Sequence, residues 1–287
     1  MTKVPCADLH IHTYFSDSAS SPQEVVDDTL KAGLSCISIT DHDIVEGIKP
    51  TIEAALPHGI EVVPGIELSS EFENCDIHIL GYFIDYEKGP LLDKIDVFLD
   101  ARMERMKKMI MNLKAVGVNN IEFEEVCALT HSRAVGRAHL AFLLQQKGWV
   151  NNIRSAFEKY IGPGRPGYAP KHKQTPFEAI ELIRSCGGVA VMAHPMLTQK
   201  DELIPRFVAA GMKGLEVYYP NCMDTVTQFY ERIALKNGLI ATGGSDAHGK
   251  IKPYTYIGKK TVPLDTVEQL RQATTTPGVR NLPNTRC

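Results

Sequence analysis

Apolar and polar positions alternate with two different periods along the first part of the chain. Short apolar runs flanked by glycine, proline or polar residues predict strands, and apolar residues three to four positions apart predict helices. Strands are expected at 4–11, 34–40, 60–68 and 76–84, and helices at 21–32 and 45–56. Such alternation is typical of βαβ units around a parallel sheet.

This alternation stops near residue 89 and resumes near residue 168. Between these points only helical periodicity is found, and helices are expected at 91–116, 122–129, 136–147 and 153–160. Beyond them, strands are expected at 189–194, 214–219, 239–242 and 254–262, with helices at 176–185, 201–209, 223–237 and 264–273. The pattern predicts an α/β, barrel-like ring of parallel strands built from 1–88 and 168–287, with 89–167 as a helical insertion that we expect to cap the substrate.

Histidines and carboxylates gather where the expected strands end, which is the edge of a barrel where active sites form. Side chains two positions apart on a strand share a face, so His10 and His12 point the same way. Asp246 and His248 repeat this spacing after a later strand. The candidate metal ligands are His10, His12, Asp17, His42, Glu67, His78, His194, Asp246 and His248.

These candidates combine imidazole with carboxylate and include no thiolate, which suits manganese, zinc or iron. They are more numerous than one ion can use, so we expect two to three divalent metal ions. Two assignments have ordinary alternatives: His78 lies inside an expected strand, as core histidines do, and Asp17 lies in a loop, as turn and helix-capping residues do. The neighbouring Asp8, Asp41 and Asp43 are expected to orient imidazoles or to cap loops.

Composition narrows the class of protein. The chain has 287 residues, of which 44% are hydrophobic and 23% charged, as is ordinary for a globular protein. A net charge of −3 argues against broad binding to a nucleic-acid backbone, so no DNA duplex is expected as a partner. The seven cysteines form no C-x-x-C pair, which favours a reducing, cytoplasmic location. Neither a signal peptide, a membrane span nor an obligate protein partner is expected.

Several of these segments together resemble a known family. Residues 8–18, 38–43, 63–69, 193–195 and 243–249 are similar to the polymerase and histidinol phosphatase (PHP) family of metal-dependent phosphoesterases, and the likeness spans nearly the whole chain. Within the insertion, 136–141 and 156–160 resemble the nucleotide phosphatase and 5′→3′ exoribonuclease branch. The resemblance implies a distorted (β/α)7 TIM-like barrel with a trinuclear metal centre.

The resemblance also implies how the ligands are shared. One metal would be held by His10, His12, Glu67 and Asp246, a second by Glu67, His78 and His194, and a third by Asp17, His42 and His248. Three divalent cations against three carboxylates leave a net positive charge that suits a phosphate dianion, and water bound to such cations loses a proton near neutral pH. We therefore expect in-line attack on phosphorus by a metal-bridging hydroxide.

The catalytic residues expected on this basis are His194, His139 and Asp246, and the substrate-binding residues are Arg137, His139 and Ser245. Arg137 would bind phosphate as a planar fork, and His139 would bind phosphate or protonate the leaving group. The alternatives are a surface arginine and a helix-cap histidine.

Two further sets of residues have ordinary interpretations. The basic helix face of Arg102, Arg105, Lys107 and Lys108 is usually solvated, with a smaller chance that one member reaches the substrate. Tyr168, Tyr218 and Tyr219 could stack a base, but tyrosines near strand ends more often pack.

The favoured function is hydrolysis of small phosphate esters, with nucleotides such as AMP and nucleoside 3′,5′-bisphosphates, or short 5′-phosphorylated RNA, as the substrate. The alternatives in the same chemistry are a histidinol-phosphate phosphatase and a cyclic sugar-phosphate phosphodiesterase. Two alternatives of other classes are an amidohydrolase-like C–N hydrolase and a non-catalytic PHP binding module. Asp17, His42 and the Asp-x-His pair at 246–248 favour the third metal position, and hence the phosphoesterase.

Overall fold

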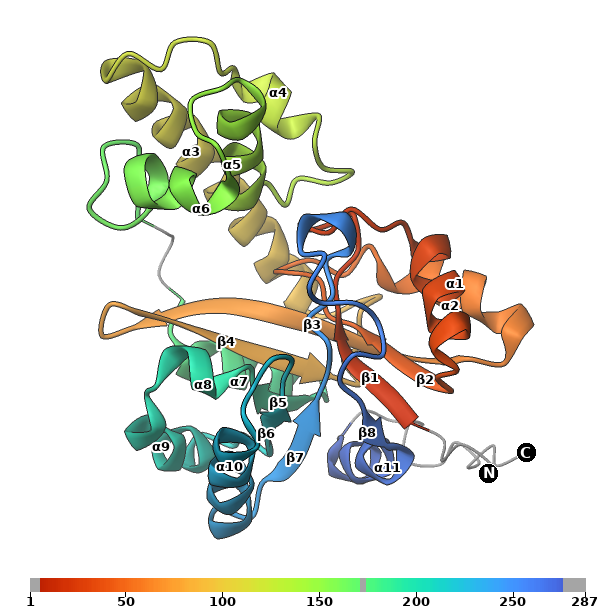
Figure 1. Ribbon diagram of the computed structural model, residues 1–287. Coiled ribbons are helices and arrows are strands. Elements are labelled where there is room, and N and C mark those ends of the chain that lie inside the picture. The colour runs from red at the N-terminus through yellow and green to blue at the C-terminus, as the bar shows by residue number, and fades with distance from the viewer. Residues whose placement is uncertain (1–5, 171–173, 276–287) are drawn as a thin grey trace.

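The computed structural model describes residues 6–170 and 174–275 (Figure 1). Within them an eight-stranded sheet runs in the order β7-β6-β5-β4-β3-β2-β1-β8. Its strands are β1 (Cys6–Ile11), β2 (Cys36–Ile39), β3 (Glu61–Phe72), β4 (Cys75–Tyr82), β5 (Val189–Met192), β6 (Gly214–Tyr218), β7 (Ile240–Gly243) and β8 (Val262–Pro263). A parallel bridge between Ile11 and Ala247 joins β1 to the chain that follows β7, so the barrel is nearly closed. The TIM-like α/β barrel expected from the sequence is confirmed, although residues 4 and 5 of the expected first strand lie outside the described residues.

The barrel closes where β7 meets β1. The amide of His12 donates to the carbonyl of Ala247 at 3.1 Å. Gly244 lies so close to β1 that a β-carbon at this position would stand 2.4 Å from the backbone nitrogen of His10. Glycine is required here because any side chain would push the two segments apart. The Gly-Gly-Ser segment therefore brings the residues that follow it beside the histidines of β1.

Helices flank the strands, and the longer ones lie where the apolar periodicity predicts them. In the barrel they are α1 (Pro22–Ala32), α2 (Ile48–Ala55), η1 (Leu56–His58), α7 (Pro176–Ser185), α8 (Pro195–Thr198), η3 (Asp201–Leu203), α9 (Ile204–Ala209), α10 (Asp224–Lys236), η4 (Gly249–Ile251) and α11 (Leu264–Ala273). Capping boxes fix the starts of α1 and α7, formed by Ser21 with Glu24 and by Thr175 with Glu178. No helix in the described part of the chain is both long and apolar enough to cross a membrane.

β8 runs antiparallel to β1, and the expectation of an all-parallel ring is also wrong for β4, which runs antiparallel to both β3 and β5. The reason is the connection: β3 and β4 are joined at Glu73 and Asn74, whose φ angles are 51° and 60°. Two residues with positive φ form a tight hairpin, whereas parallel neighbours need a long crossover. As a result, the first half of β4 lies beside the last half of β3, at the edge where the parallel strands end.

The strand expected at 254–262 is also wrong, because only Val262–Pro263 pairs with β1. The residues before Val262 form hydrogen bonds with a residue of the candidate metal site and with a side chain of β1, and not with the backbone of a neighbouring strand. The Thr255 hydroxyl donates to the carbonyl of Asp246 at 3.1 Å, and the Gly258 amide donates to the carboxylate of Asp8 at 2.9 Å. This segment therefore covers the end of the barrel as a loop.

Residues between β4 and α7 form a helical layer beside the barrel, made of α3 (Pro90–Ala115), α4 (Phe123–Cys127), α5 (Arg137–Gln146), α6 (Ile153–Ala156) and η2 (Phe157–Ile161) (Figure 1). The long helix α3 belongs to two hydrophobic cores. Its first half buries Leu91 and Phe98 with the barrel, and its second half buries Met109 and Leu113 with α5 and η2. The midpoint of α3, around Arg102, therefore lies at the junction between barrel and helical layer.

Candidate metal centre

The nine candidate ligands come from six separate segments, and the fold brings them to one edge of the barrel. His10 is the last residue but one of β1, and His12 and Asp17 follow that strand. Glu67 and His78 lie on β3 and β4. His42 follows β2, His194 follows β5, and Asp246 and His248 follow β7. The antiparallel direction of β4 explains how His78 reaches this edge from inside a strand.

Glu67 lies at the centre of the cluster, with 1% of its surface exposed. Its Oε2 lies 3.1 Å from His10 Nε2 and 3.2 Å from His12 Nε2. Its Oε1 lies 2.7 Å from His78 Nδ1 and 3.0 Å from His194 Nε2. His42 Nδ1 also lies 3.3 Å from Oε2, so one carboxylate faces five imidazoles with its two oxygens and could serve more than one cation.

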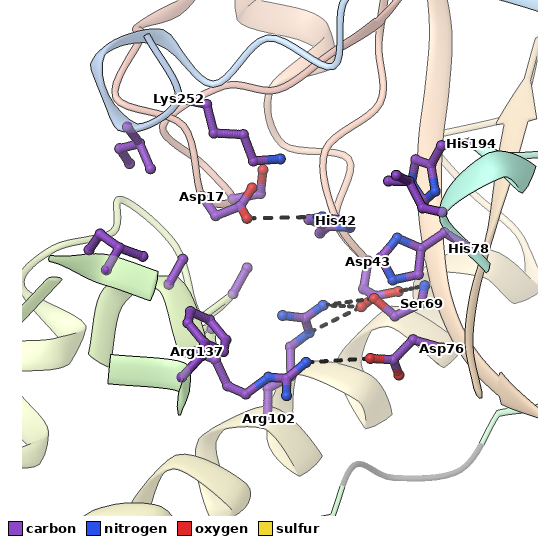
Figure 2. Close-up of a pocket in the computed structure, with 18 of the residues that line it drawn as sticks. Asp17, His42, Asp43, Ser69, Asp76, His78, Arg102, Arg137, His194 and Lys252 are labelled. Atoms are coloured by element: carbon purple, nitrogen blue, oxygen red, sulfur yellow. Dashed lines mark hydrogen bonds and ion pairs between the residues drawn. The ribbon is translucent and has the colours of Figure 1, made fainter. Parts of the chain in front are cut away.

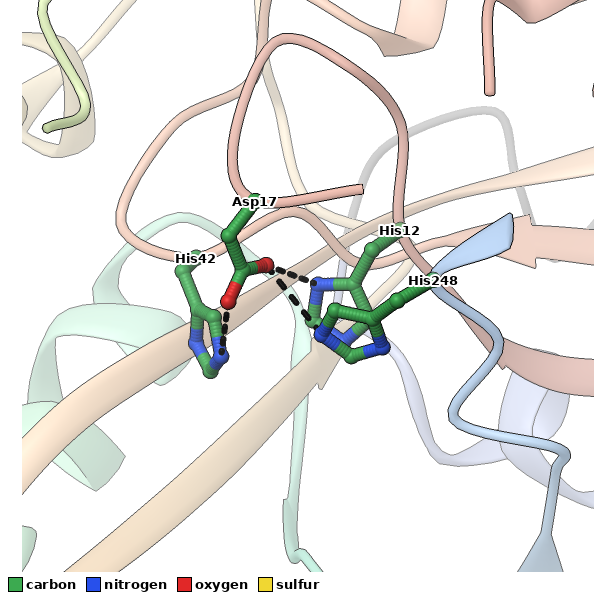
Figure 3. A group of neighbouring side chains, drawn as sticks. All are labelled: His12, Asp17, His42 and His248. Atoms are coloured by element: carbon green, nitrogen blue, oxygen red, sulfur yellow. Dashed lines mark ion pairs between the residues drawn. The ribbon is translucent and has the colours of Figure 1, made fainter. Parts of the chain in front are cut away.

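A second carboxylate, Asp17, organises the other side of the cluster (Figure 3). Its Oδ1 lies 3.2 Å from His248 Nε2 and 3.7 Å from His12 Nδ1, and its Oδ2 lies 3.9 Å from His42 Nε2. The alternative of a helix cap does not hold, because Ser21 caps the following helix α1. Asp17 instead points back into the barrel with the histidines.

Three overlapping groups have ligand atoms within 4.8 Å of one another: His10, His12, Glu67 and Asp246; His12, Asp17, His42 and His248; and His42, Glu67 and His78. Several of these atoms are buried without a hydrogen-bond partner, namely His12 Nδ1, Asp17 Oδ1, His42 Nδ1, His194 Nδ1 and His248 Nε2. A buried nitrogen or oxygen without a partner is costly, and a cation removes that cost. The residues therefore fit divalent metal ions.

The electrostatics of the cluster favour charged carboxylates. Burial alone would raise the pKa values of Asp17, Glu67 and Asp246, but surrounding imidazoles, and Lys252 beside Asp246, hold all three well below their usual range. The pKa of His12 is raised to about 9, since its contacts with Asp246 and Glu67 outweigh the effect of burial. Three negative charges in a buried site again call for cations.

Two candidate ligands adopt strained backbone conformations. His194 has a φ of 27° and Asp246 a φ of 48°, in the region that favours glycine. Such strain persists only where surrounding structure holds it in place, and it concentrates at functional sites. The His194 amide donates to Glu216 Oε2 at 2.7 Å, which helps to hold this turn.

Glu216 is a site residue that the sequence interpretation missed. It lies on β6 with no exposed surface, and its Oε1 lies 2.8 Å from His10 Nδ1. A carboxylate on the far nitrogen of a ligand histidine fixes the ring and increases its basicity. The available signal was Glu216 itself, an acidic residue between Leu215 and Val217 in a strand that is otherwise apolar, because a buried carboxylate requires a partner.

Tyr219 also belongs to the site. Its hydroxyl donates to Asp246 Oδ2 at 2.7 Å, and its ring lies edge-on to His194 with 5.7 Å between ring centres. Asp8 and Asp41 serve the loops, as the sequence interpretation allowed. The Ser245 amide donates to Asp8 at 2.8 Å, and the Thr13 amide donates to Asp41 at 2.7 Å. Burial raises the pKa of both carboxyls to about 6.

A pocket of about 1030 Å³ opens onto this cluster (Figure 2). Its floor includes Asp17, His42, His78 and His194, and α3, α5 and η2 of the helical layer form one wall. That wall carries Arg102, Arg105 and Arg137, so two members of the basic face of α3 reach the pocket. Lys252 lines the opposite side.

Each arginine of this wall is held differently. Arg102 pairs with Asp43, the residue after the candidate ligand His42, with its Nε 3.1 Å from the carboxylate. Arg137 lies 3.4 Å from Asp76. Arg105 donates through Nε to the carbonyl of Ala169 at 2.8 Å, while its buried Nη2 has no hydrogen-bond partner. Burial and then the neighbouring Arg137 lower the pKa of Arg105 to about 10.

The remaining predicted substrate residues lie deeper. His139 is 4% exposed, and its Nδ1 accepts the amide of Gly136 at 3.0 Å, which closes the first turn of α5. Ser245 has no exposed surface. Neither is among the residues that line the pocket, whereas Arg137 is. Substrate contact by His139 and Ser245 stays a prediction that the pocket does not support.

Replacing Glu216 by glutamine is expected to lower the affinity for Mn²⁺ by about 10- to 100-fold, because the His10 ring loses its charged partner. Calorimetric titration of the metal-free protein measures this directly. Glu231→Gln is the control, since Glu231 lies on α10 and accepts a hydrogen bond from the Tyr218 hydroxyl at 3.0 Å, away from the candidate ligands. Equal Mn²⁺ affinities for Glu216→Gln and the wild type would contradict the role given to Glu216.

Metal binding is expected to release protons at neutral pH. The raised pKa of His12, about 9, means that its ring carries a proton in the metal-free folded protein, and that proton must leave before the ring can hold a cation. Mn²⁺ affinity should therefore rise as the pH increases from 6.5 toward about 9. Calorimetry in two buffers of different ionisation enthalpy measures the release. His58→Asn, at an exposed position, should leave it unchanged, and a wild type that releases no proton would contradict the expectation.

Comparison with known proteins agrees with this geometry. A family model for the PHP domain matches residues 8–190. The 3′,5′-nucleoside bisphosphate phosphatase of Chromobacterium violaceum is 32% identical over 247 residues, which cover 84% of this chain and 86% of the relative. The 5′-3′ exoribonuclease Rnm of Escherichia coli is 30% identical over 262 residues, which cover 88% of each chain.

A solved structure from Bifidobacterium adolescentis, inferred to be a metal-dependent phosphoesterase, superposes with a TM-score of 0.86 at 28% identity over 96% of this chain and 99% of that one. The family model covers more than half of the chain, and the relatives cover most of it. The buried His, Asp and Glu cluster is the part of the molecule that such an activity requires. The chain belongs to the PHP family and is a metal-dependent hydrolase of phosphoric esters.

Proposed function

We propose that this enzyme hydrolyses a phosphate ester of a nucleotide that carries a second phosphate, as in a nucleoside 3′,5′-bisphosphate or a short 5′-phosphorylated RNA. The observation that carries the proposal is the single pocket that joins the metal centre to the arginine wall (Figure 2). A substrate with two phosphates separated by a sugar matches two cationic regions in one pocket. The relatives in Chromobacterium violaceum and Escherichia coli are named for these two substrate classes.

The arginine wall supports a second anion. The buried Nη2 of Arg105 has no partner, and the lowered pKa of Arg105 reflects burial and repulsion by Arg137. A phosphate would satisfy the free donors and offset the repulsion, since guanidinium binds phosphate through two parallel hydrogen bonds. Gln174, in the same pocket, is 4% exposed, and its side-chain amide atoms are also unpaired. This end of the pocket therefore offers donors and an acceptor to a ligand.

The ligand groups support two to three ions, with manganese, zinc or iron as the suitable metals. When bound, divalent cations supply Lewis-acid stabilisation of phosphate charge and a water acidic enough to act as the nucleophile. The protein contributes positioning. Glu67 presents its two oxygens to the surrounding histidines, Glu216 orients His10, and Tyr219 fixes the outer oxygen of Asp246.

Residues 89–167 act as the cap of this enzyme, and 1–88 with 168–287 act as the barrel. The support is that α3, α5 and η2 supply one wall of the pocket while barrel residues supply its floor. Arg137 lines this wall and is assigned to phosphate binding. His139 is the weaker assignment as leaving-group acid, because its Nδ1 already accepts a backbone amide within α5.

The second candidate is a cyclic sugar phosphate that carries another phosphate, because it would use the same two regions of the pocket. Histidinol phosphate has a single phosphate and would leave the arginine wall without a ligand. An amide substrate of an amidohydrolase would do the same. A non-catalytic binding module is disfavoured because every expected ligand position is filled by a histidine or carboxylate that faces the cluster.

His194→Ala is expected to lower turnover of phosphate esters by two or more orders of magnitude while leaving the fold intact. Its Nε2 lies 3.0 Å from Oε1 of the central Glu67, so alanine removes a candidate metal ligand. Phosphate release under single-turnover conditions measures the loss, and circular dichroism checks the fold. His58→Ala, at an exposed position, is the control. Rates near those of the wild type would refute a role for His194 in the site.

Arg105→Met is expected to raise KM for adenosine 3′,5′-bisphosphate by about 10- to 100-fold, as expected for loss of one charged hydrogen bond. The two adenosine monophosphates should differ. KM should rise much less for the monophosphate that lacks the phosphate bound by the arginine wall. Arg133→Met is the matched control, since Arg133 pairs with Asp96 and Asp100 on the exposed side of α3. Equal losses for the bisphosphate and both monophosphates would contradict a separate second-phosphate region.

A further inference from the structure

Lys252 is a cationic side chain beside the metal cluster and is not one of the candidate ligands. It follows η4, in the loop between β7 and β8, and lines the large pocket. Its Nζ lies 3.2 Å from Asp246 Oδ2, and about a third of its side chain is exposed, at 34%. Figure 2 shows its ammonium group pointing toward Asp17, across the pocket from Arg102 and Arg137.

Asp246 is already held without this lysine. Its inner oxygen, Oδ1, lies 3.2 Å from His12 Nε2 and 3.6 Å from His10 Nε2, on the side of the cluster. Its outer oxygen, Oδ2, accepts the hydroxyl of Tyr219 at the shorter distance of 2.7 Å. A lysine ammonium has three donors, and within the described residues Asp246 Oδ2 is the hydrogen-bond acceptor found for Lys252. Two donors therefore stay available on the pocket side.

Occupation of the cluster by cations changes the surroundings of this ammonium. The carboxylates that now attract Lys252 are chiefly Asp246 and Asp17. Cations bound by the same carboxylates offset their negative charge and add positive charge close to Nζ. The ammonium then requires a new anion at short range, and the anion that the proposed reaction brings to this place is the phosphate.

We propose that Lys252 is a catalytic residue that binds an oxygen of the reacting phosphate at the metal centre. This inference rests on the proposed phosphoesterase function and names a phosphate contact separate from the arginine wall. Charge builds on the phosphate oxygens and on the leaving oxygen as the ester bond breaks, and a fixed ammonium on the pocket side stabilises that charge. Lys252 thus acts from the barrel side, and the arginines act from the helical layer.

The competing explanation is that Lys252 only clamps Asp246. The two explanations differ in what the loss of the ammonium does to metal binding. A clamp would weaken metal binding when removed, and excess metal would then restore activity. A phosphate-binding ammonium repels the cations, so its removal leaves Mn²⁺ affinity unchanged or slightly stronger while phosphate affinity falls.

The test compares Lys252→Met, Lys252→Arg and the control Lys250→Met in the full-length protein. Lys250 is two residues away, exposed, and lines a separate pocket. Three quantities are measured for each protein: kcat and KM on the best phosphate ester, Mn²⁺ affinity of the metal-free protein, and affinity of the Mn²⁺-loaded protein for inorganic phosphate. Thermal unfolding checks that each variant folds, and Lys252→Gln replaces Lys252→Met if the latter does not fold.

Lys252→Met should lose about 100-fold in kcat, as when one donor to a developing oxyanion is removed, and should bind phosphate at least about 10-fold more weakly. Its Mn²⁺ affinity should match that of the wild type, Lys252→Arg should recover part of the rate, and Lys250→Met should behave as the wild type. Wild-type kcat and phosphate affinity in Lys252→Met, or full recovery with excess Mn²⁺, would overturn the inference. A wild type that neither binds phosphate nor hydrolyses any phosphate ester would instead overturn the proposed function.

Discussion

The rest of this structure depends on one buried carboxylate. Glu67 carries a negative charge at 1% exposure in the middle of the barrel edge, which is costly unless opposite charge surrounds it. Imidazoles from β1, β4 and the loops after β2 and β5 face its two oxygens. Segments distant in the sequence are thus held at one point. Histidine rings cannot fully compensate the three carboxylates of the cluster while remaining neutral ligands, and divalent cations can.

A layer of outer residues holds these ligands in place. Glu216 contacts the His10 ring and the backbone of His194, so one carboxylate sets the orientation of ligands from two strands. Asp8 accepts amides from the loop after β7 and from the loop before β8, which ties both to β1. These hydrogen bonds explain how His194 and Asp246 retain positive φ angles, which are unfavourable for residues other than glycine. Pre-positioned ligands need little rearrangement when phosphate arrives.

The helical layer adds positive charge outside the ligand set. Helix α3 is buried at one end with the barrel and at the other with α5, and Arg102 at the junction pairs with Asp43 beside a ligand loop. Because Asp43 follows His42 in the chain, this ion pair holds the arginine wall and the His42 loop in a fixed relative position. Under the proposed function, the barrel would hold the cations and the helical layer would bind the second phosphate.

The sequence by itself determined the barrel and the gathering of most candidate ligands at one edge, because strand periodicity puts His10 and His12 on one face and places acids and imidazoles where parallel strands end. It could not determine that His78 joins them, since this depends on the antiparallel direction of β4, which a two-residue hairpin decides. Glu216 could be recognised from the sequence only as a buried acid that needs a partner. The identity of that partner, His10, depends on how β6 and β1 are arranged in the fold. The helical pattern at 91–116 predicted a basic face, but only the tertiary packing of α3 decided that Arg105 reaches the pocket. Local periodicity fixes which face of an element is apolar, whereas pairing direction and long-range packing fix which side chains meet.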